Sequence, residues 1–548
     1  MSAASLTHSL RVGKTMKYMK LGTRSEIFFS DSDSTRSVCS EMLATDVKIQ
    51  VDGTNFLLHK FPLVSKCSYL KTILSHPPVT VEKAPMEECT VVKLSQFPGG
   101  ASTFELCAKF CYGVTITISP INIVAVRSAA QYLQMSDDFD KGNLAGKLDS
   151  FLNSCILRRL KDSIVVLQST RKLQESSDEI GITRTCLEAI SKIILSDPSN
   201  PSSGKWWGDT ISELGIDHFE KLMNILSSAR KFPSKVIGDV IITYTRRWLH
   251  KTPQSSSSSS SSLQDKNRQV LAKIAVLIPP GRDSVPISFL LRLLKASNRL
   301  NSSMATKIDL TRRAGLQLGE AEVTDLLIPS VSTETTDTTL IYDVDLVMMM
   351  VEEFLLSHLE IREPITRVAN IIDNYLIEVA KDANLPIIKF VNLVEAIPNY
   401  ARLNHDNLYH AIDIFLKEHR QLGKSDRKKL CRVLDCKKLS MEACMHAAQN
   451  EMLPLRVVVQ VLFFEQVRAA ESGFPSDDVV VAAGIDEETG DAGWTDVAET
   501  LKMKLEDEEN EVDHSNGILR RSSSERFKAL CAIPTKHKRM ISRLWSLD

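Results

Sequence analysis

The sequence lacks long apolar runs and a surplus of either charge. No segment reaches the roughly 18 consecutive apolar residues that a membrane-spanning helix needs. The N-terminal stretch MSAASLTHSLRVGKTMKYMK also has no apolar core of the kind found in secretory signals. Lys and Arg total 67 against 68 Asp and Glu, a net charge of −1. We therefore expect a cytoplasmic protein with no overall electrostatic attraction to nucleic acid.

Paired cysteine motifs are missing as well. The chain has eleven cysteines but no C-x-x-C pair, so reduced thiols are expected rather than a disulfide framework. Cys431, Cys436, Cys444 and His446 could suggest a zinc site, yet structural zinc ligands usually come as two closely spaced pairs. The spacing therefore favours the alternative interpretation, in which the cysteines are buried core thiols.

No motif for nucleotide binding or hydrolysis is present. The sequence contains no G-x-x-x-x-G-K-[ST], G-x-G-x-x-G, H-E-x-x-H or G-x-S-x-G. Cys444 and His446 could in principle form a nucleophile pair, but residues two apart on a helix point away from each other. We expect no catalytic, cofactor-binding or metal-binding residues and no enzymatic activity of the chain itself.

Several domains are expected in a chain of 548 residues. In VKIQVDGTNFLL, residues 47–58, Val47, Ile49 and Val51 alternate with polar residues, and Asp52-Gly53 predicts a hairpin turn. Helical spacing follows in SKCSYLKTIL, then a strand in TVVKL, then helices from Ser102. The first ~150 residues therefore read as an α+β domain, and most of the remainder reads as helical.

The apolar stretch HAAQNEMLPLRVVVQVLFFEQVR, residues 446–468, is open to three interpretations: a membrane span, a catalytic strand with His446, or a core helix. It is too short to span a bilayer. Pro454 is placed to open a helix, and Leu455, Val458, Val459, Leu462 and Phe463 have helical spacing. We predict a core helix, and we expect His446 to pack or hydrogen-bond on the helix that precedes this core helix.

Two adjacent tryptophans, Trp206-Trp207, also have two interpretations. They could form an exposed anchor for a partner, but packing inside the protein at the start of a domain is favoured.

Two groups of segments resemble known families. ATDVKIQVDGTNFLLHKFPLVSKCSYL and FELCAKFCYGVTITISPINIVAVRSAAQYLQM are similar to a BTB/POZ domain. KWWGDTISELGIDHFEKLM, RLNHDNLYHAIDIFLKEH and KKLCRVLDCKKLSMEACMHAAQNEMLPLRVVVQVLFFEQ resemble the helical domain of the plant non-phototropic hypocotyl three (root phototropism two-like) family. The resemblance covers roughly residues 16–470. It departs from the family pattern at Asn407, Met452 and Gly208-Asp209.

The resemblance implies an α+β BTB/POZ domain followed by a mostly all-α domain. We predict a flexible N-terminal segment (1–43), a BTB/POZ domain with its following helices (44–150), and a helical connector (151–204). An all-α family-specific domain (205–468) follows, with disordered loops near 252–264, which holds a run of eight serines, and near 328–340. Residues 469–548 are expected to be a largely disordered tail, first acidic and then basic.

The resemblance also implies a function. BTB domains dimerise, here with the same chain or a paralogue, and many bind a cullin of the third class. The chain would then be the substrate-specific adaptor of a cullin–RING ubiquitin ligase in plant phototropin or auxin-transport signalling, with phototropin-like kinases as partners. Phe97 would lie on the cullin-facing surface, whereas Phe104, Cys107 and Phe110 favour core positions. The alternative is a plasma-membrane signalling scaffold for kinases and transport proteins, without ligase function.

The C-terminal tail carries candidate regulatory residues. Ser546 follows Arg543 by three residues and would form a C-terminal 14-3-3 motif when phosphorylated. Ser523 and Ser524 follow two arginines and form a second candidate phosphorylation site. A short basic amphipathic segment could bring the tail onto an anionic plasma membrane, although a solvated tail is an equal alternative. The residues expected to contact the membrane are Lys536, Lys538, Arg539, Arg543 and Trp545.

Overall fold

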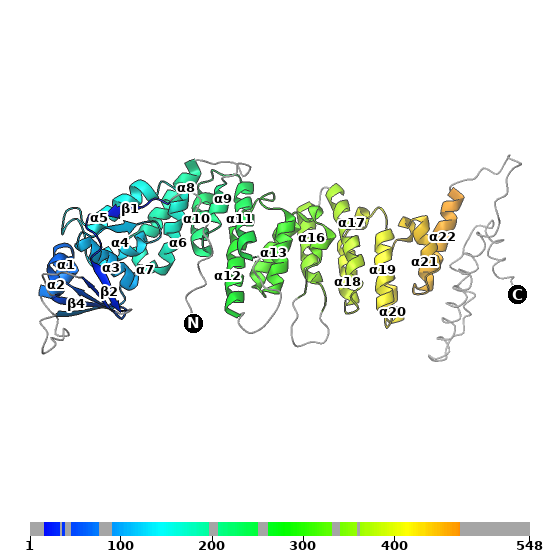
Figure 1. Ribbon diagram of the computed structural model, residues 1–548. Coiled ribbons are helices and arrows are strands. Elements are labelled where there is room, and N and C mark those ends of the chain that lie inside the picture. The colour runs from blue at the N-terminus through cyan, green and yellow to red at the C-terminus, as the bar shows by residue number, and fades with distance from the viewer. Residues whose placement is uncertain are drawn as a thin grey trace, which may run out of the picture. The chain divides into compact units, whose positions relative to one another are not determined.

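The structure, a computed structural model, describes residues 16–32, 35–38, 45–75, 90–196, 206–249, 261–330, 340–358 and 362–471. The chain divides into two compact units, Met1–Val285 and Pro286–Asp548. Among the residues just given, named strands occur in the first unit only, and the second unit is built from helices (Figure 1). The predicted fold class, an α+β N-terminal domain followed by a mostly helical region, is therefore confirmed.

A five-stranded sheet forms the β part of the first unit. Its strands lie in the order β2-β3-β5-β4-β6, with β3/β5 and β4/β6 parallel and the other pairs antiparallel. Their bounds are β2 Phe28–Ser32, β3 Thr35–Val38, β4 Val47–Val51, β5 Thr54–Leu58 and β6 Thr90–Leu94. The alternating residues Val47, Ile49 and Val51 are all fully buried, which confirms the predicted strand and its inward face.

The predicted hairpin turn joins β4 to β5. Asp52 and Gly53 both have positive φ, 47° and 83°, as the central residues of a type I′ turn require. Asp-Gly is among the residue pairs that readily adopt this conformation, because glycine has no Cβ and aspartate tolerates the left-handed region. The turn therefore fixes the register in which Ile49 pairs with Phe56.

Part of the N-terminal segment 1–43, predicted to be flexible, forms strands. β1 (Met19–Leu21) pairs antiparallel with β7 (Ile116–Ile118), and β2 and β3 join the edge of the main sheet. At Gly22 a Cβ atom would lie 2.3 Å from the carbonyl oxygen of Val114, so only glycine allows this close approach. The prediction fails here because these short strands lack an alternating pattern, and their partners lie far away in the sequence.

Helices cover the sheet and extend the first unit. Their bounds are α1 Lys60–Lys66, α2 Ser68–Ser75, α3 Gly100–Cys111, α4 Ile123–Tyr132, α5 Leu144–Phe151, the π-helical turn η1 Leu152–Ile156, α6 Leu160–Ser169, the 3₁₀ turn η2 Thr170–Lys172, α7 Gln174–Glu179, α8 Ile182–Ser196, α9 Trp207–Ile211, α10 Ile216–Ser228, α11 Ser234–Leu249 and α12 Ser261–Leu277. Since α12 begins at Ser261, the end of the predicted loop 252–264 is helical.

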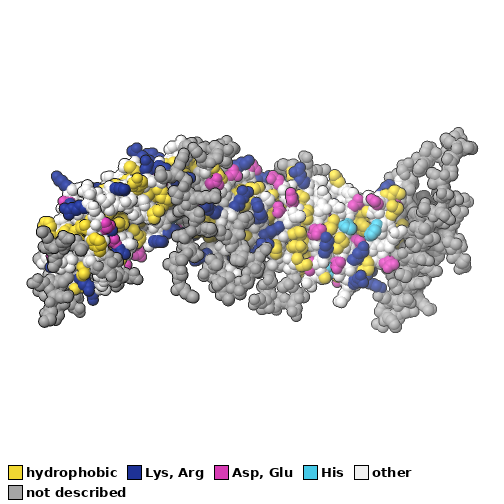
Figure 2. Space-filling view, in the orientation of Figure 1, with side chains coloured by type: hydrophobic (Ala, Val, Ile, Leu, Met, Phe, Trp, Pro, Cys, Tyr) yellow, Lys and Arg dark blue, Asp and Glu magenta, His cyan; other side chains and the backbone are white. Residues whose placement is uncertain are grey.

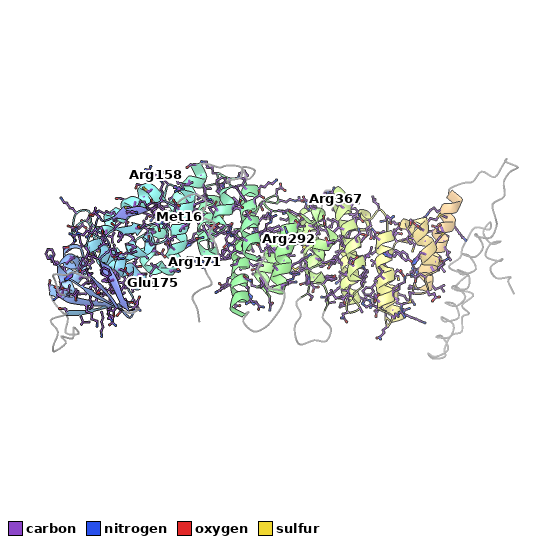
Figure 3. All side chains as sticks on the ribbon, viewed as in Figure 1. Met16, Arg158, Arg171, Glu175, Arg292 and Arg367 are labelled. Carbon is purple, nitrogen blue, oxygen red and sulfur yellow. The ribbon has the colours of Figure 1, made fainter. Side chains whose placement is uncertain are left out.

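The side chain of Arg171, labelled in Figure 3, lies against Gly215, the residue before α10. A Cβ atom at Gly215 would lie 2.7 Å from Nη1 of Arg171.

The second unit is a series of packed helices. α13 packs on α14, α14 on α16, α16 on α18, α17 on α19, and α21 on α22. The bounds are α13 Ile287–Arg299, α14 Met304–Gly315, η3 Leu318–Glu320, α15 Val323–Leu326, α16 Val344–His358, α17 Arg362–Val379, α18 Ile387–Ala396, η4 Asn399–Ala401, α19 Asp406–Glu418, α20 Lys424–Cys431, η5 Cys436–Lys438, α21 Met441–Ala448 and α22 Leu455–Glu471.

The predicted apolar helix after Pro454 is α22, but its buried face differs in part from the prediction. Val457, Val458 and Val461 are buried, whereas Val459 and Phe463 are 36% and 50% exposed. Because the apolar residues of α22 occur on most sides of the helix, their periodicity alone does not define which side is buried. The contacts of α22 with α21 and η5 decide which side is buried.

Candidate functional site

An exposed aromatic side chain lies at the start of α1 in the first unit. The backbone N–H groups of His59 and Lys60 donate to the hydroxyl of Tyr112 and to Oδ1 of Asp46, both at 2.7 Å. These two bonds fix the path of the chain into α1, where Phe61 is 81% exposed. An aromatic side chain held outward on a fixed backbone suits a protein–protein contact. The sequence alone did not indicate Phe61 as a contact residue.

Phe97, predicted to lie on a cullin-facing surface, has its side chain in the core. It is 4% exposed, and its ring packs edge-on against Phe104 and Tyr132, with centroid distances of 5.5 and 5.2 Å. Burial of Phe104 agrees with the core position favoured from the sequence. The exposed neighbours Ser95 and Gln96 supply the surface beside Phe97. A cullin contact at this place stays a prediction.

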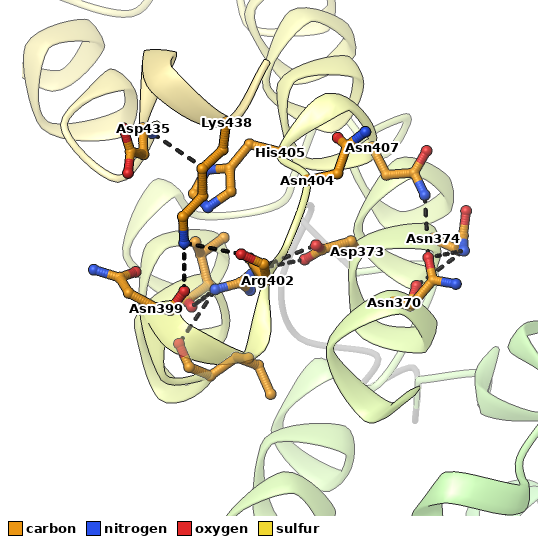
Figure 4. Close-up of polar contacts among 12 residues, drawn as sticks. Asn370, Asp373, Asn374, Asn399, Arg402, Asn404, His405, Asn407, Asp435 and Lys438 are labelled. Carbon is orange, nitrogen blue, oxygen red and sulfur yellow. Dashed lines mark hydrogen bonds and ion pairs between the residues drawn. The ribbon is translucent and has the colours of Figure 1, made fainter. Parts of the chain in front are cut away.

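A buried polar network centres on Arg402 in the second unit (Figure 4). Its Nε donates to Oδ1 and Oδ2 of Asp373 at 3.0 and 3.1 Å, and the two side chains are 2% and 5% exposed. Its Nη1 donates to the carbonyl oxygens of Val394 and Ile397 at 2.9 and 3.2 Å. Because Asp373 belongs to α17 and the two carbonyls lie at the end of α18, Arg402 joins these helices to the start of α19.

A second layer of bonds joins this network to the segment between α20 and α21. Lys438 Nζ donates to the carbonyl oxygens of Asn399 and Arg402 at 2.6 and 2.8 Å. His405, which is 1% exposed, accepts from the backbone N–H of Asp435 through Nδ1 at 3.2 Å. Figure 4 shows these groups converging from both sides of the backbone around residue 402. The network therefore holds together segments that are distant in the sequence.

Burial shifts two acid–base groups of this network in opposite directions. Loss of solvation raises the pKa of Asp373 to about 6, although the nearby Arg402 guanidinium opposes the change. Loss of solvation, reinforced by the positive charges of Lys438 and Arg402, lowers the pKa of His405 to about 4. His405 is therefore neutral at physiological pH and can accept the bond from Asp435.

Asn407, one of the departures from the family pattern, adds a contact to the same region. Its Nδ2 donates to Oδ1 of Asn370 on α17 at 3.2 Å. The neighbouring Asp406 lies in the first turn of α19 and accepts from the backbone N–H of Ser440 at 2.9 Å. Ser440 in turn caps α21, since its hydroxyl accepts from the backbone N–H of Ala443 at 3.2 Å.

His446 makes a structural contact, as predicted. His446 lies on α21, the helix before α22, and its Nδ1 is 2.6 Å from the hydroxyl of Tyr409 on α19. Burial raises the pKa of Cys444 to about 12, which disfavours the thiolate that a nucleophile requires. In the described part of the chain, no group of three or more His, Cys, Asp or Glu residues could hold a metal ion. Cys431, Cys436 and Cys444 are buried free thiols.

The two tryptophans pack within the first unit. Trp207 is 4% exposed and its ring centroid lies 5.4 Å from that of Phe232. Trp206 is half-buried and its ring folds over Gly208, where a Cβ would lie 2.7 Å from the indole. This arrangement agrees with the packing interpretation and explains how glycine at this departure from the family pattern fits the local structure.

The candidate residues of the C-terminal tail lie outside the described residues, so their roles stay predictions. They are Ser523, Ser524, Lys536, Lys538, Arg539, Arg543, Trp545 and Ser546. Within the described ranges, no helix combines the length and apolar character needed to cross a membrane.

The sheet and helices of the first unit define a BTB-type protein–protein interaction domain, and a long helical region follows it. Comparison with known families agrees: the BTB/POZ domain model matches residues 37–143, and the NPH3 family model matches residues 205–444. The chain belongs to the NPH3 family of BTB proteins. Membership places it among adaptors or scaffolds and suggests a role without catalysis.

Relatives from Arabidopsis thaliana match along most of their length. BTB/POZ domain-containing protein At1g67900 is 42% identical, covering 97% of this chain and 99% of the relative. Phototropic-responsive NPH3 family proteins NPY2 and NPY1 are 37% and 35% identical, covering 90% and 97% of this chain and 83% and 93% of the relatives. No solved structure matches the chain.

Proposed function

We propose that this protein is the substrate-recruiting adaptor of a cullin–RING ubiquitin ligase in plant phototropin- or auxin-type signalling. The BTB domain binds a cullin of the third class and a second copy or a paralogue, and the helical region holds the client. The observation that carries the proposal is the joining, in one chain, of a BTB fold to a helical region of the NPH3 family. Tethering then accelerates ubiquitin transfer by raising the local concentration of the client.

The tail supplies regulation in this proposal. Phosphorylation of Ser546 by a phototropin-like or related kinase creates a 14-3-3 ligand, with Ser523 and Ser524 as further phosphorylation sites. The added negative charge weakens contact between the basic tail and an anionic plasma membrane. The protein thus moves between the membrane surface and the cytoplasm. A Ser546→Ala protein that binds 14-3-3 and partitions like the wild type contradicts this part of the proposal.

Cullin binding by the full chain tests the proposal. Titration calorimetry with the N-terminal domain of the cullin is expected to give a saturable heat for the wild type. Ser95→Arg places a bulky charge beside Phe97 without entering the core, and we expect it to weaken binding. Asn153→Arg, an equally exposed change in η1, is the matched control and is expected to bind normally.

The three proteins distinguish between the possible outcomes. Equal weakening by both substitutions would contradict a contact beside Phe97, but it would not contradict cullin binding by the wild type. Absence of binding by the wild type would contradict the ligase function itself and favour the scaffold, which shares the fold but needs no cullin.

A further inference from the structure

Five cations gather on and beside α20 in the second unit. Arg420, Lys424, Lys428, Arg432 and Lys437 are all exposed, and we call them the basic stripe. Lys424, Lys428 and Arg432 follow one another at four-residue intervals, so their side chains lie along one face of the helix and its final turn. Leu430 and Cys431 are buried on another side. Figure 2 shows Lys and Arg side chains on the visible face in the region where α20 lies in Figure 1.

The basic stripe contains unfavourable charge contacts within the described structure. Like charges four residues apart on a helix repel each other, and Lys424 occupies the first turn, where the helix dipole disfavours a cation. In the part of the chain that the structure describes, Lys428 and Arg432 form no ion pair, and the nearby Asp426 pairs with Lys429 at 3.5 Å. A stripe of this kind therefore suits an anionic partner.

The same chain carries a strongly acidic segment. Residues 506–513 read EDEENEVD, so six of the eight residues are Asp or Glu. We propose that the basic stripe binds this acidic segment, residues 506–513 of the same chain. The contact is an electrostatic one between carboxylates and exposed ammonium or guanidinium groups, and it covers the α20 face when no other anion competes for it.

The length of the chain allows this contact. α22 ends at Glu471, and the acidic segment begins 35 residues later. Thirty-five residues span at most about 120 Å when extended, at roughly 3.3–3.6 Å each. α22 itself lies beside the stripe, because Lys437 Nζ sits 5.2 Å from the ring centroid of Phe464. Attachment through α22 keeps the segment near the stripe and raises its effective concentration there.

Zero-length cross-linking of the full chain tests the proposal. A carbodiimide joins lysine amines to carboxylates in direct contact, and mass spectrometry identifies the linked peptides. We expect links from Lys424, Lys428 or Lys437 to residues 506–513, with a yield that falls as salt is raised. Lys428→Glu combined with Arg432→Glu should reduce the yield several-fold. Adding Glu506→Lys and Glu508→Lys should restore links between the reversed charges.

A matched control reverses charges elsewhere. Lys235→Glu with Arg246→Glu changes two exposed cations of α11 in the first unit and should leave the links unchanged. A yield that is insensitive to the stripe reversal, or links from the acidic segment to the basic residues 536–543 instead, would overturn the proposal. The proposal also fails if anionic vesicles bind the wild type through Lys428 and Arg432 while no intramolecular link forms.

Discussion

Replacing Arg402 is expected to destabilise the second unit strongly. Arg402→Met removes the cation that pairs with Asp373 through two bonds of 3.0 and 3.1 Å, and it leaves two carbonyl oxygens without their donor. Breaking a buried ion pair by removing one partner costs about 3–5 kcal/mol. A loss of this size lowers the thermal midpoint of a 150–250-residue unit by roughly 6–20 °C.

The cost arises from an uncompensated charge, so the double variant should recover stability. Arg402→Met with Asp373→Leu replaces the pair by apolar side chains, and such replacements are often neutral or stabilising. Hydrogen exchange along α17, α18 and α19 and thermal unfolding followed by circular dichroism measure both effects in the full chain. Arg367→Met is the control, because Arg367 is an exposed residue of the same α17 (Figure 3).

Two results would refute this reasoning. If Arg402→Met costs no more than Arg367→Met, expected within about 0.5 kcal/mol of wild type, the network does not hold the helices together. If the double variant is as unstable as the sum of the two single variants, the pair is not coupled. We also expect acidification to relieve Arg402→Met, because protonation of Asp373 removes the buried charge.

The remaining predictions concern pH, a helix cap and a close helix contact. The pKa of His405 falls from 6.5 unfolded to about 4 folded, so its contribution of ~3 kcal/mol is present above pH 6.5 and lost as pH falls through 4. The pKa of Asp373 rises from 3.8 to about 6, so its contribution of similar size is present below pH 3.8 and lost as pH rises through 6. His405→Asn keeps a hydrogen-bond acceptor but cannot titrate, so this variant loses no stability from residue 405 as the pH falls from 6.5 to 4. Over that range the unfolding free energy of the variant should therefore rise more steeply than that of wild type. Parallel pH profiles for the two proteins would contradict this. Ser440→Ala should cost about 1 kcal/mol in denaturant unfolding by removing the cap of α21, with recovery in Ser440→Thr. Gly238→Ala would place a Cβ 1.7 Å from the carbonyl oxygen of Ser284, and a cost of about 1–3 kcal/mol is expected from overpacking; unchanged unfolding would rule out this close contact.

Local patterns predicted the elements that local physics determines. The hairpin over 47–58 follows from alternation and from Asp52-Gly53, and the helix after Pro454 follows from the spacing of its apolar residues. By contrast, β1 and β2 were not predicted, because their stability depends on distant pairing partners such as Ile118 and Val38. β1 has only three residues, and β2 (FFSDS) does not alternate apolar and polar residues as β4 does, so neither strand is recognised without those partners.

The candidate site shows the same limit. Arg402 and Asp373 are separated by 29 residues, and nothing in either local segment indicates that they form one buried pair. Phe97 is another case: the family resemblance implied a place on the cullin-facing surface, but Phe104 and Tyr132 enclose its side chain. The exposed Phe61 was missed for the opposite reason, since an aromatic residue in a helix is usually assigned to the core.

The most direct test of the central claim is the mass of the complex in solution. The full chain is mixed with the N-terminal domain of a third-class cullin and separated by size-exclusion chromatography with light scattering. The adaptor proposal predicts a stable species containing one cullin domain for each copy of the chain. Elution of the two proteins as separate species at concentrations where the chain is fully folded would contradict it.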